Sequence, residues 1–414
     1  MILGIVVILI VTCAALWTIQ KDTGNRFIMG GTASVCFLPF EIFQTSFSGS
    51  YLAYISPFSI YATSIFLLYL IKNIILAKKL KINLHFALGC LFIAFLLALS
   101  FFKADNLGLA TILDNYVAPI LSIYILINER DRIKEKSLNT AILIISLCAL
   151  YGFLEYLISY NYLMHPIFKS ASWIDTQWTP TTHRSTSTIG HPLVAATAYL
   201  LALTSLKIKD INSRIIELSL FLGIISTGSR TAFALAIGTI LLKQSRTVLT
   251  PKGFLLLSSF FIFLLVVFAS GVLDYIIYRF FNSEGSNLVR TALLEHIPAI
   301  ISNYWLMGTG IGTSGANIQS FGFFSAIEIP WIALTMEVGL IPLVFCALLV
   351  FLTLKKYGEL DKNWLTLVIT ISMLSSYNSV SVHSPIIFLG TLFIIRNHCK
   401  PTSAANSTMF SIQN

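Results

Sequence analysis

Charged residues are scarce in this chain. Lysine, arginine, aspartate and glutamate make up 11% of its 414 residues, whereas a soluble domain usually has about 25%. Hydrophobic residues make up 56%, and the mean hydropathy is +0.82. This charge is too sparse to cover the surface of a water-exposed globule of that size. The composition therefore excludes a soluble enzyme, a disordered tail and a fibrous protein.

The chain also lacks the cysteine patterns of metal sites and disulfide frameworks. Of its six cysteines, five lie in apolar runs and Cys399 lies in a basic tail, and no two stand at C-x-x-C spacing. No zinc site and no disulfide framework is predicted. The histidines form no H-E-x-x-H or similar spacing, so we expect neither a metal nor another cofactor.

What the chain does contain is a succession of apolar runs, many of them near the roughly 20 residues that cross a bilayer. The predicted spans are 1–19, 27–47, 51–75, 84–102, 107–128, 140–160, 190–206, 215–227, 231–242, 254–273, 329–354, 364–381 and 385–396. The first run has no basic segment before it and no A-x-A site, which favours a retained helix over a signal peptide. The sequence predicts one integral membrane domain over residues 1–414, an all-α polytopic bundle of about 12 or 13 transmembrane helices.

Basic residues give the chain a net charge of +9. Of the 27 lysines and arginines, 21 cluster in alternate connections between spans, which predicts that those connections are cytoplasmic. This orientation role accounts for the basic charge, and no nucleic-acid partner is expected. The other six cations are Lys103, Lys169, Arg184, Arg230, Arg279 and Arg290. They concentrate around two long connections, 161–189 and 274–328, which we expect to be ordered, amphipathic external loops at the membrane surface.

The first polar motif is Arg184-Ser-Thr-Ser-Thr-Ile-Gly190-His191-Pro192, which runs into a predicted helix. An arginine beside hydroxyl groups and the free N–H groups of a helix N-terminus suits an anionic ligand, above all a phosphate. The alternative is an arginine at the membrane interface that contacts lipid headgroups.

The second motif, Ser226-Thr-Gly-Ser-Arg230-Thr-Ala, separates the two short apolar segments 215–227 and 231–242. A charge there costs at least about 2.5–3.5 kcal/mol on insertion scales, so it must face a cavity or a partner. Arg230 is either a ligand-binding residue or a structural residue that bonds backbone carbonyls freed by the broken helix. Both interpretations stay open.

Two further motifs lie towards the C-terminus. Arg290, in Asn287-Leu-Val-Arg-Thr-Ala-Leu-Leu-Glu295-His296, is an anion-binding candidate, with an ion pair to Glu295 as the alternative. The run Trp305-Leu-Met-Gly308-Thr-Gly-Ile-Gly312 is a weak nucleotide signature, because no strand precedes it and no Lys-Ser/Thr follows, and a tight turn at the membrane surface is favoured.

Carboxylates form the remaining candidates. Glu328, at the mouth of the span that begins at 329, is either a general base or an acid favoured by a helix N-terminus. Glu41, Asp114 and Glu155 lie within predicted spans, where an ionisable residue is a functional candidate by default. A transporter with a proton relay would use such groups.

The order of these motifs resembles the O-antigen ligase/polymerase family of polytopic glycosyltransferases. The resemblance covers residues 184–342 and rests on R-x-T-x-T-x-G-H-P, T-G-S-R-T-A, R-T-A-x-x-E-x-I, W-x-x-G-x-G-x-G and M-E-V-G-L-I. The S-R-T-A element within a broken apolar span is its most specific part. The first 180 residues resemble the family only in hydropathy.

The resemblance implies a GT-C-like bundle with long periplasmic loops in the bacterial inner membrane, and an active site on the external face. It implies an inverting, metal-independent transfer of glycan from an undecaprenyl-pyrophosphate donor to an acceptor hydroxyl. Arg184, Arg230 and Arg290 fall on family arginines, and in ligases such loop arginines are thought to hold the donor pyrophosphate. With His191, these three are the expected substrate-binding residues, and Arg290 and Glu328 are the expected catalytic residues.

One departure from the family decides between two activities. Ligases typically carry His-Asn nine residues before the glutamate of the E-x-G-L-I helix, whereas this chain has Glu328-Ile329 there. We therefore expect a polymerase of lipid-linked oligosaccharide repeat units, whose partners are the lipid-linked donor, membrane lipid and a chain-length regulator protein. An O-antigen ligase that transfers polymer to lipid A-core is the first alternative, and a polysaccharide transporter or flippase is the second.

Overall fold

The computed structural model describes most of the chain. The described ranges are 2–20, 22–48, 50–76, 84–103, 106–165, 183–207, 210–245, 291–322 without 292, 329–357, 360–375 and 383–398, with isolated positions between 262 and 277. These residues form helices and the segments that connect them, and no β-strand occurs among them. The all-α prediction is confirmed for this part of the chain.

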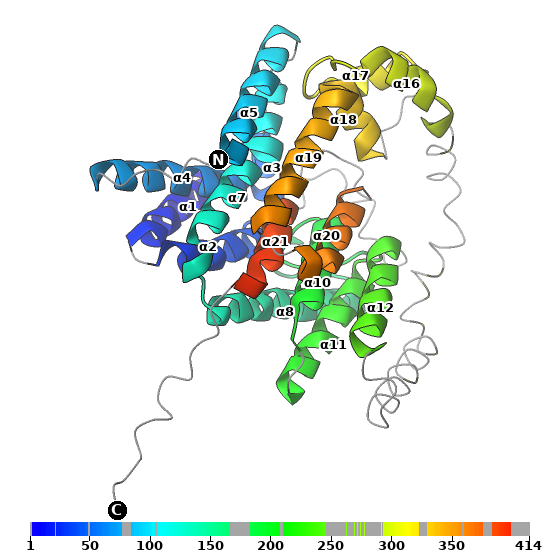
Figure 1. The fold of residues 1–414 in the computed structure, drawn as a ribbon. Helices are drawn as coiled ribbons and strands as arrows, with labels where there is room; N and C mark the ends of the chain where they lie inside the picture. Colours follow the sequence, from blue (N-terminus) through cyan, green and yellow to red (C-terminus); the bar gives the residue numbers. More distant parts are fainter. Residues whose placement is uncertain are drawn as a thin grey trace, which may run out of the picture.

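The helices alternate with short turns along most of the sequence (Figure 1). The α-helices are α1 (Ile2–Gln20), α2 (Thr23–Phe37), α3 (Glu41–Ser46), α4 (Pro57–Ile75), α5 (Leu84–Lys103), α6 (Asn106–Ile112), α7 (Ala118–Glu129), α8 (Glu135–Ile158), α10 (Pro192–Ser205), α11 (Ile211–Ser226), α12 (Arg230–Ser245), α16 (Ile297–Tyr304), α17 (Ser314–Gln319), α18 (Pro330–Val338), α19 (Leu340–Tyr357), α20 (Leu360–Ser375) and α21 (His383–Ile394). A π-helical turn, η2 (Leu113–Val117), joins α6 to α7, and 3-10 turns occur at η1 (Tyr51–Tyr54), η3 (Arg130–Arg132) and η5 (Ile395–His398).

Four uninterrupted helical segments in the described part are long and apolar enough to cross a membrane. They are Pro57–Ile75, Leu84–Phe101, Gly108–Arg132 and Glu135–Ile158. The bent pair α18 and α19 makes a fifth if it counts as one span, and four further apolar helices are shorter. The chain is thus a helical protein with several segments able to span a membrane, and the larger predicted span count stays a prediction.

The predicted span 329–354 is not one straight helix. It bends by 113° between α18 and α19, at Gly339, whose φ of +99° is open to glycine but strained for other residues. A second break separates α11 from α12 at Thr227–Ser229, as the sequence predicts, although each helix has 16 residues and is longer than the predicted half-span.

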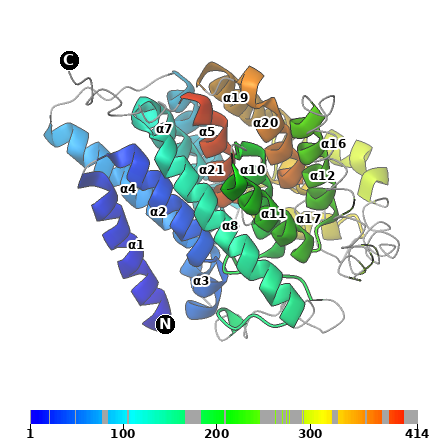
Figure 2. The same cartoon turned by 90° about the horizontal axis from the view of Figure 1, so that it is seen from below.

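Helix α10 lies at the centre of the bundle (Figure 2). It packs against α8, α11, α12, α20 and α21, and 11 of its 14 residues are buried. Alanines at 195, 196, 198 and 202 allow this close approach, because a small side chain lets neighbouring backbones come near. Both ends of α10 are therefore held by protein on every side, and its N-terminus carries the first polar motif.

Candidate functional site

The segment His183–His191, which we call the arginine loop, runs inside the bundle. Residues 183–190 are all buried, and Arg184 is only 8% exposed. The sequence places this segment at the end of an external surface loop, so its burial is a difference from that prediction. The greater part of the predicted loop, residues 166–182, lies outside the described residues.

Glu155 of α8 holds the arginine loop in place. Its carboxylate is buried and accepts hydrogen bonds from Ser187 N (2.7 Å to Oε2), Thr186 N (3.0 Å to Oε1) and Ser185 Oγ (3.0 Å to Oε2). His183 Nε2 lies 3.3 Å from Oε1. These donors surround both carboxylate oxygens, which offsets the cost of burying the charge.

Asn161 is a second anchor for the same segment. Its Nδ2 donates to Ser187 O (2.8 Å) and to Thr186 Oγ1 (3.0 Å), and its Oδ1 accepts from Tyr151 OH (2.7 Å). Ser187 itself has a φ of +53° and donates through Oγ to Cys148 O at 2.6 Å. The loop is therefore rigidly bonded from α8 and from the turn that follows α8.

The arginine loop contacts the broken segment between α11 and α12. Ser185 N donates to Ser226 O at 3.0 Å, and Arg184 Nε donates to Thr227 O at 2.9 Å. These carbonyls lie at the end of α11, where no further turn of helix supplies a donor. Arg184 thus makes the kind of contact, to carbonyls at the break, that the sequence predicts as one of two roles for Arg230.

Two helix N-termini begin at the motif residues. His191 is the N-cap of α10, and its Nδ1 accepts from Leu193 N at 3.2 Å, so the neutral ring carries its proton on Nε2. Arg230 is the first residue of α12. The Arg184 guanidinium is close enough to interact electrostatically with His191. Cationic side chains and helix N-termini together favour a bound anion.

The far end of the arginine loop packs on Glu41 of α3. Gly190 has a φ of +99°, and a Cβ built on it would lie 2.2 Å from Glu41 Oε2. Glu41 is 3% exposed, and Oε2 makes no hydrogen bond to any residue that the structure describes. Glu41 and His191 both line a cavity of about 20 Å³.

A second cluster joins the glycine run to the bend between α18 and α19. Gly308 lies against the backbone of Glu337, where a Cβ would come within 2.2 Å of the Glu337 carbonyl. Gly310 N donates to Glu337 O at 3.0 Å, and the Glu337 side chain accepts from Ser314 Oγ at 2.6 Å. The structure therefore contains the predicted tight turn, and its hydrogen bonds to Glu337 stabilise the bend. The glycines are needed for close backbone contact, and nothing in this geometry points to a nucleotide.

An apolar cavity of about 390 Å³ lies among α7, α18, α19, α20 and α21. Ile123, Trp331, Phe351, Leu367 and Ile387 are among the side chains that line it. This volume is within the roughly 300–1,000 Å³ of typical ligand sites, and its walls offer few polar groups. The cavity suits a hydrocarbon chain.

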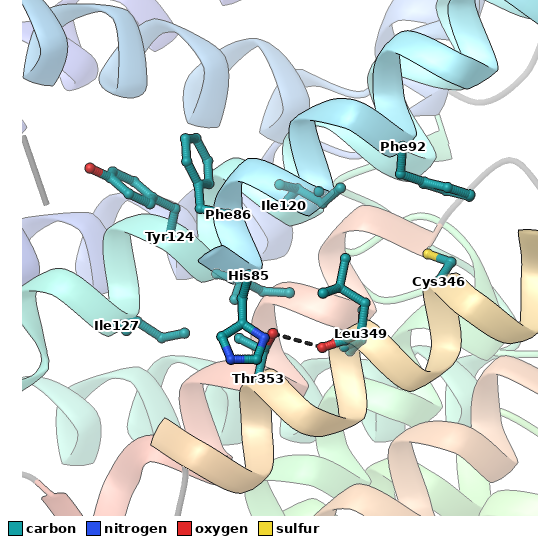
Figure 3. Close-up of a pocket in the computed structure, with 12 residues that line it drawn as sticks. His85, Phe86, Phe92, Ile120, Tyr124, Ile127, Cys346, Leu349 and Thr353 are labelled. Atoms are coloured by element: carbon teal, nitrogen blue, oxygen red, sulfur yellow. Dashed lines mark hydrogen bonds between the residues drawn. The ribbon is translucent and has the colours of Figure 1, made fainter. Parts of the chain in front are cut away.

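A smaller cavity of about 40 Å³ adjoins it between α5, α7 and α19 (Figure 3). Its walls are formed by Phe92, Tyr124, Cys346 and neighbouring apolar side chains, with His85 at one side. The Thr353 hydroxyl donates to Leu349 O at 2.7 Å along its own helix. Because the two cavities share Ile120, Ile123, Cys346 and Val350, the smaller one extends the apolar space.

The structure brings three of the five predicted site residues into one region: Arg184, His191 and Arg230. The other two, Arg290 and Glu328, lie outside the described residues. Among described residues, no group of three or more histidine, cysteine or acidic side chains could hold a metal. Asn161 carries no sequence signal, because a single asparagine in a loop has no diagnostic spacing.

Comparison with known proteins identifies no relative of this chain. No family model, no curated protein and no solved structure matches this chain.

Proposed function

We propose that this protein is a membrane glycosyltransferase that polymerises lipid-linked oligosaccharides. In this proposal it transfers glycan from an undecaprenyl-pyrophosphate donor to a sugar hydroxyl of the acceptor, with inversion. The site faces the external, periplasmic side of a bacterial inner membrane, within the GT-C-like architecture that the family resemblance implies.

The observation that carries the proposal is the meeting of the two arginine motifs. Residues 183–191 and 226–230 are far apart in the sequence, yet Ser185 and Arg184 bond the carbonyls of Ser226 and Thr227. The contact brings Arg184 into the region where His191 and Arg230 begin α10 and α12. Cationic side chains and helix N-termini that lie in one region favour a bound anion.

A pyrophosphate leaving group explains this chemistry. Negative charge develops on the departing phosphate oxygen as the bond to the anomeric carbon breaks. Arginine stabilises that charge with a bidentate fork and keeps its own proton at every physiological pH. A base then has only to accept the proton of the acceptor hydroxyl, the role that the sequence assigns to Glu328.

The lipid part of the donor accounts for the apolar cavity. A polyprenyl chain needs a channel that excludes water, and the 390 Å³ cavity is lined almost entirely by apolar side chains of membrane-type helices. No nucleotide-sugar site is required, because the energy for transfer arrives in the pyrophosphate bond.

The test is polymer length in cells that carry substituted proteins. Arg184→Ala and Arg290→Ala are expected to abolish long polymer while membrane abundance stays unchanged. Arg184→Lys keeps the charge but loses the fork, so it should retain a small part of the activity. Lys207→Ala, which removes an exposed cation that pairs with Glu135, is the matched control and should leave polymer length unchanged. Normal chain length in both alanine variants would overturn the proposal.

The lipid-linked glycan profile of a deletion strain separates the alternatives. Single repeat units on the final acceptor indicate a polymerase. Accumulated lipid-linked polymer indicates the ligase, and lipid-linked repeat units held on the cytoplasmic face indicate the flippase. Among described residues, both helix breaks lie in the second half of the chain, whereas transporters built from repeats carry broken helices in both halves.

A further inference from the structure

The apolar cavity among α7, α18, α19, α20 and α21 has one polar feature that the lipid chain of the donor does not explain. Tyr116, in the π-helical turn η2, lines this cavity and is 9% exposed. Its hydroxyl is buried and forms no hydrogen bond with any described residue. Buried polar atoms without a partner are rare and costly, so this hydroxyl indicates a missing partner.

Other polar side chains on the cavity wall already have partners. Trp331 Nε1 donates to Ser375 Oγ at 2.5 Å, and Thr370 Oγ1 donates to Thr366 O at 2.7 Å. Among the side chains that line the cavity, all of which the structure describes, the Tyr116 hydroxyl is the one buried nitrogen or oxygen without a partner. A polar group of a ligand would therefore be held at Tyr116.

The π-helical turn fixes the position of this phenol. Two residues before Tyr116, Asp114 Oδ1 accepts hydrogen bonds from Ser56 N at 3.0 Å and from Ser59 Oγ at 2.6 Å, which ties the turn to the start of α4. Tyr116 also packs in one buried cluster with Leu334 and other residues around α18. Single π-helical turns inside α-helices occur frequently at functional sites. The phenol is thus held from two sides before any ligand binds.

A carboxyl group stands beside this phenol. Glu337 of α18 is 2% exposed and is close enough to Tyr116 to interact with it electrostatically. Its Oε1 accepts from Ser314 Oγ at 2.6 Å, whereas its Oε2 is buried with no hydrogen bond from a described residue. An acceptor in this place favours a ligand head that brings a proton and disfavours an anionic head.

The head group that fits these surroundings is a hydroxyl. It can accept from the phenol and donate its own proton, or the reverse. An ammonium brings three protons to a place with few acceptors, and a phosphate or carboxylate meets Glu337. The 390 Å³ of apolar space beside Tyr116 suits a hydrocarbon chain. An uncharged alcohol with a long apolar chain matches both parts of the site.

We propose that this cavity binds an uncharged long-chain alcohol of the membrane, whose hydroxyl bonds Tyr116 Oη. The inference goes beyond the proposed function, because it gives the protein a second lipid ligand that is recognised without a phosphate. In the proposed function the donor's chain uses the same apolar space, so the alcohol competes with the donor. Binding of the alcohol is measured without a donor and does not depend on that function.

The test uses purified full-length protein in detergent and native mass spectrometry, which counts bound lipid directly. The probes are hexadecanol, hexadecane and hexadecanoic acid, which have equal chains and different heads. Wild-type protein should bind the alcohol about two- to tenfold more tightly than the alkane, the range that one net hydrogen bond gives. It should bind the acid more weakly than the alcohol, because the acid meets Glu337.

Two variants separate the contributions of the head-group contacts. Tyr116→Phe removes the hydroxyl and keeps the ring, so alcohol and alkane should bind equally. Its melting temperature without ligand should stay the same or rise, because the lost group had no partner. Glu337→Gln keeps an oxygen for Ser314 and removes the charge, so the acid should bind about as tightly as the alcohol.

Tyr54→Phe is the matched control. Tyr54 is 44% exposed and does not line the cavity. This variant also loses one phenol hydroxyl, and it should bind all three probes as the wild type does.

A photoreactive alcohol locates the site without any substitution. Hexadecanol that carries a diazirine in its chain should cross-link to peptides of α7, α19 and α21, which line the cavity, and unlabelled hexadecanol should suppress these cross-links. Cross-links confined to the exposed apolar side chains of α1 and α8 would overturn the proposal. This measurement keeps its meaning even if Tyr116→Phe folds poorly.

The outcomes separate the two proposals. Selective binding of the alcohol by a protein that makes no polymer supports the lipid site and contradicts the proposed function. Equal affinity of the wild type for alcohol and alkane overturns the lipid site, whatever the polymer assay gives. An unchanged preference for the alcohol in Tyr116→Phe also overturns it, since the hydroxyl of the ligand is then held elsewhere.

Discussion

Glu155 and Glu41 are two buried carboxylates that hold opposite ends of the same loop, and their surroundings differ. Glu155 accepts two backbone N–H groups and a hydroxyl at 2.7–3.0 Å. Glu41 Oε2 has no hydrogen bond from a described residue and faces a cavity. Burial alone therefore does not tell what a membrane carboxylate does.

The difference lies in which part of the molecule depends on each group. The donors around Glu155 are buried and would have no partner without it, so the loop and the carboxylate stabilise each other. Removal of the Glu41 carboxylate, in contrast, takes the acceptor from no described donor. We infer that the stability of the fold depends more on Glu155 than on Glu41. Substitutions at four positions test this contrast.

The largest effect is expected from Glu155→Leu. It leaves Thr186 N, Ser187 N and Ser185 Oγ buried without an acceptor, and the expected loss is about 3–5 kcal/mol in the free energy of unfolding. The protein should fail to accumulate in the membrane, or should melt far below the wild type when followed by tryptophan fluorescence. The melting temperature of Glu155→Gln should lie between those of the wild type and Glu155→Leu, because the NH₂ group of glutamine must face a backbone N–H. A melting temperature near that of the wild type in Glu155→Leu would contradict the assignment.

Gly190→Ala is expected to come next. The added Cβ meets Glu41 Oε2 at 2.2 Å, and the φ of +99° is strained for alanine, so the loss should be about 2–3 kcal/mol. Thermal unfolding in detergent measures it. Gly238→Ala, in α12 with open space around the new Cβ, is the control and should be neutral or stabilising. Adding Glu41→Ala to Gly190→Ala should recover only part of the steric cost, because Pro39 Cβ also lies 2.6 Å from the added Cβ. No recovery would show that the two residues do not press on each other.

Ser187 distinguishes hydrogen bonding from backbone strain in the loop. Ser187→Ala loses the bond to Cys148 O and should cost about 1 kcal/mol, because that carbonyl keeps its bond from Tyr199 OH at 3.2 Å. Ser187→Gly loses the same hydroxyl but relaxes the φ of +53° and should cost less. The comparison needs only melting temperatures, and a greater loss in the glycine variant would mean that strain is not stored there.

The smallest effect is expected from Glu41→Gln. The change keeps the shape, and its effect on the free energy of unfolding should stay below about 1 kcal/mol because no described donor depends on the charge. The measurement is a melting curve beside that of Glu155→Gln. Equal losses in the two glutamine variants would remove the contrast between the carboxylates.

The sequence predicts the elements of this fold better than their contacts. Apolar runs, the break at Thr227–Ser229 and the motif at Arg184 follow from composition and spacing. That Arg184 bonds Thr227 O does not, because the contact depends on how α8, α10 and α11 pack, and a separation of 43 residues fixes no distance. Glu155 is recognisable as an intramembrane acid, but its donors are 30 to 32 residues away.

The bend at Gly339 shows a second limit. The hydropathy pattern predicts one continuous span over 329–354, because the residues on both sides of Gly339 are apolar. A single glycine inside a helical pattern is tolerated and does not predict a break. The bend requires Gly308 from another segment to pack against Glu337, and no local pattern carries that information. The 390 Å³ cavity beside the bend could not be predicted for the same reason.

The enclosure of α10 has a consequence for how slowly its backbone exchanges hydrogen. Its amides are surrounded by five other helices, and at its C-terminal end Lys243 and Arg396 bond the carbonyls of Leu203, Ser205 and Leu206. Opening this helix requires separating the bundle, so its amides should exchange with deuterium at the rate of global unfolding. The N-terminus of α10 is therefore already ordered before any ligand binds. Its conformational entropy was lost when the protein folded, so binding a ligand there would lose little more.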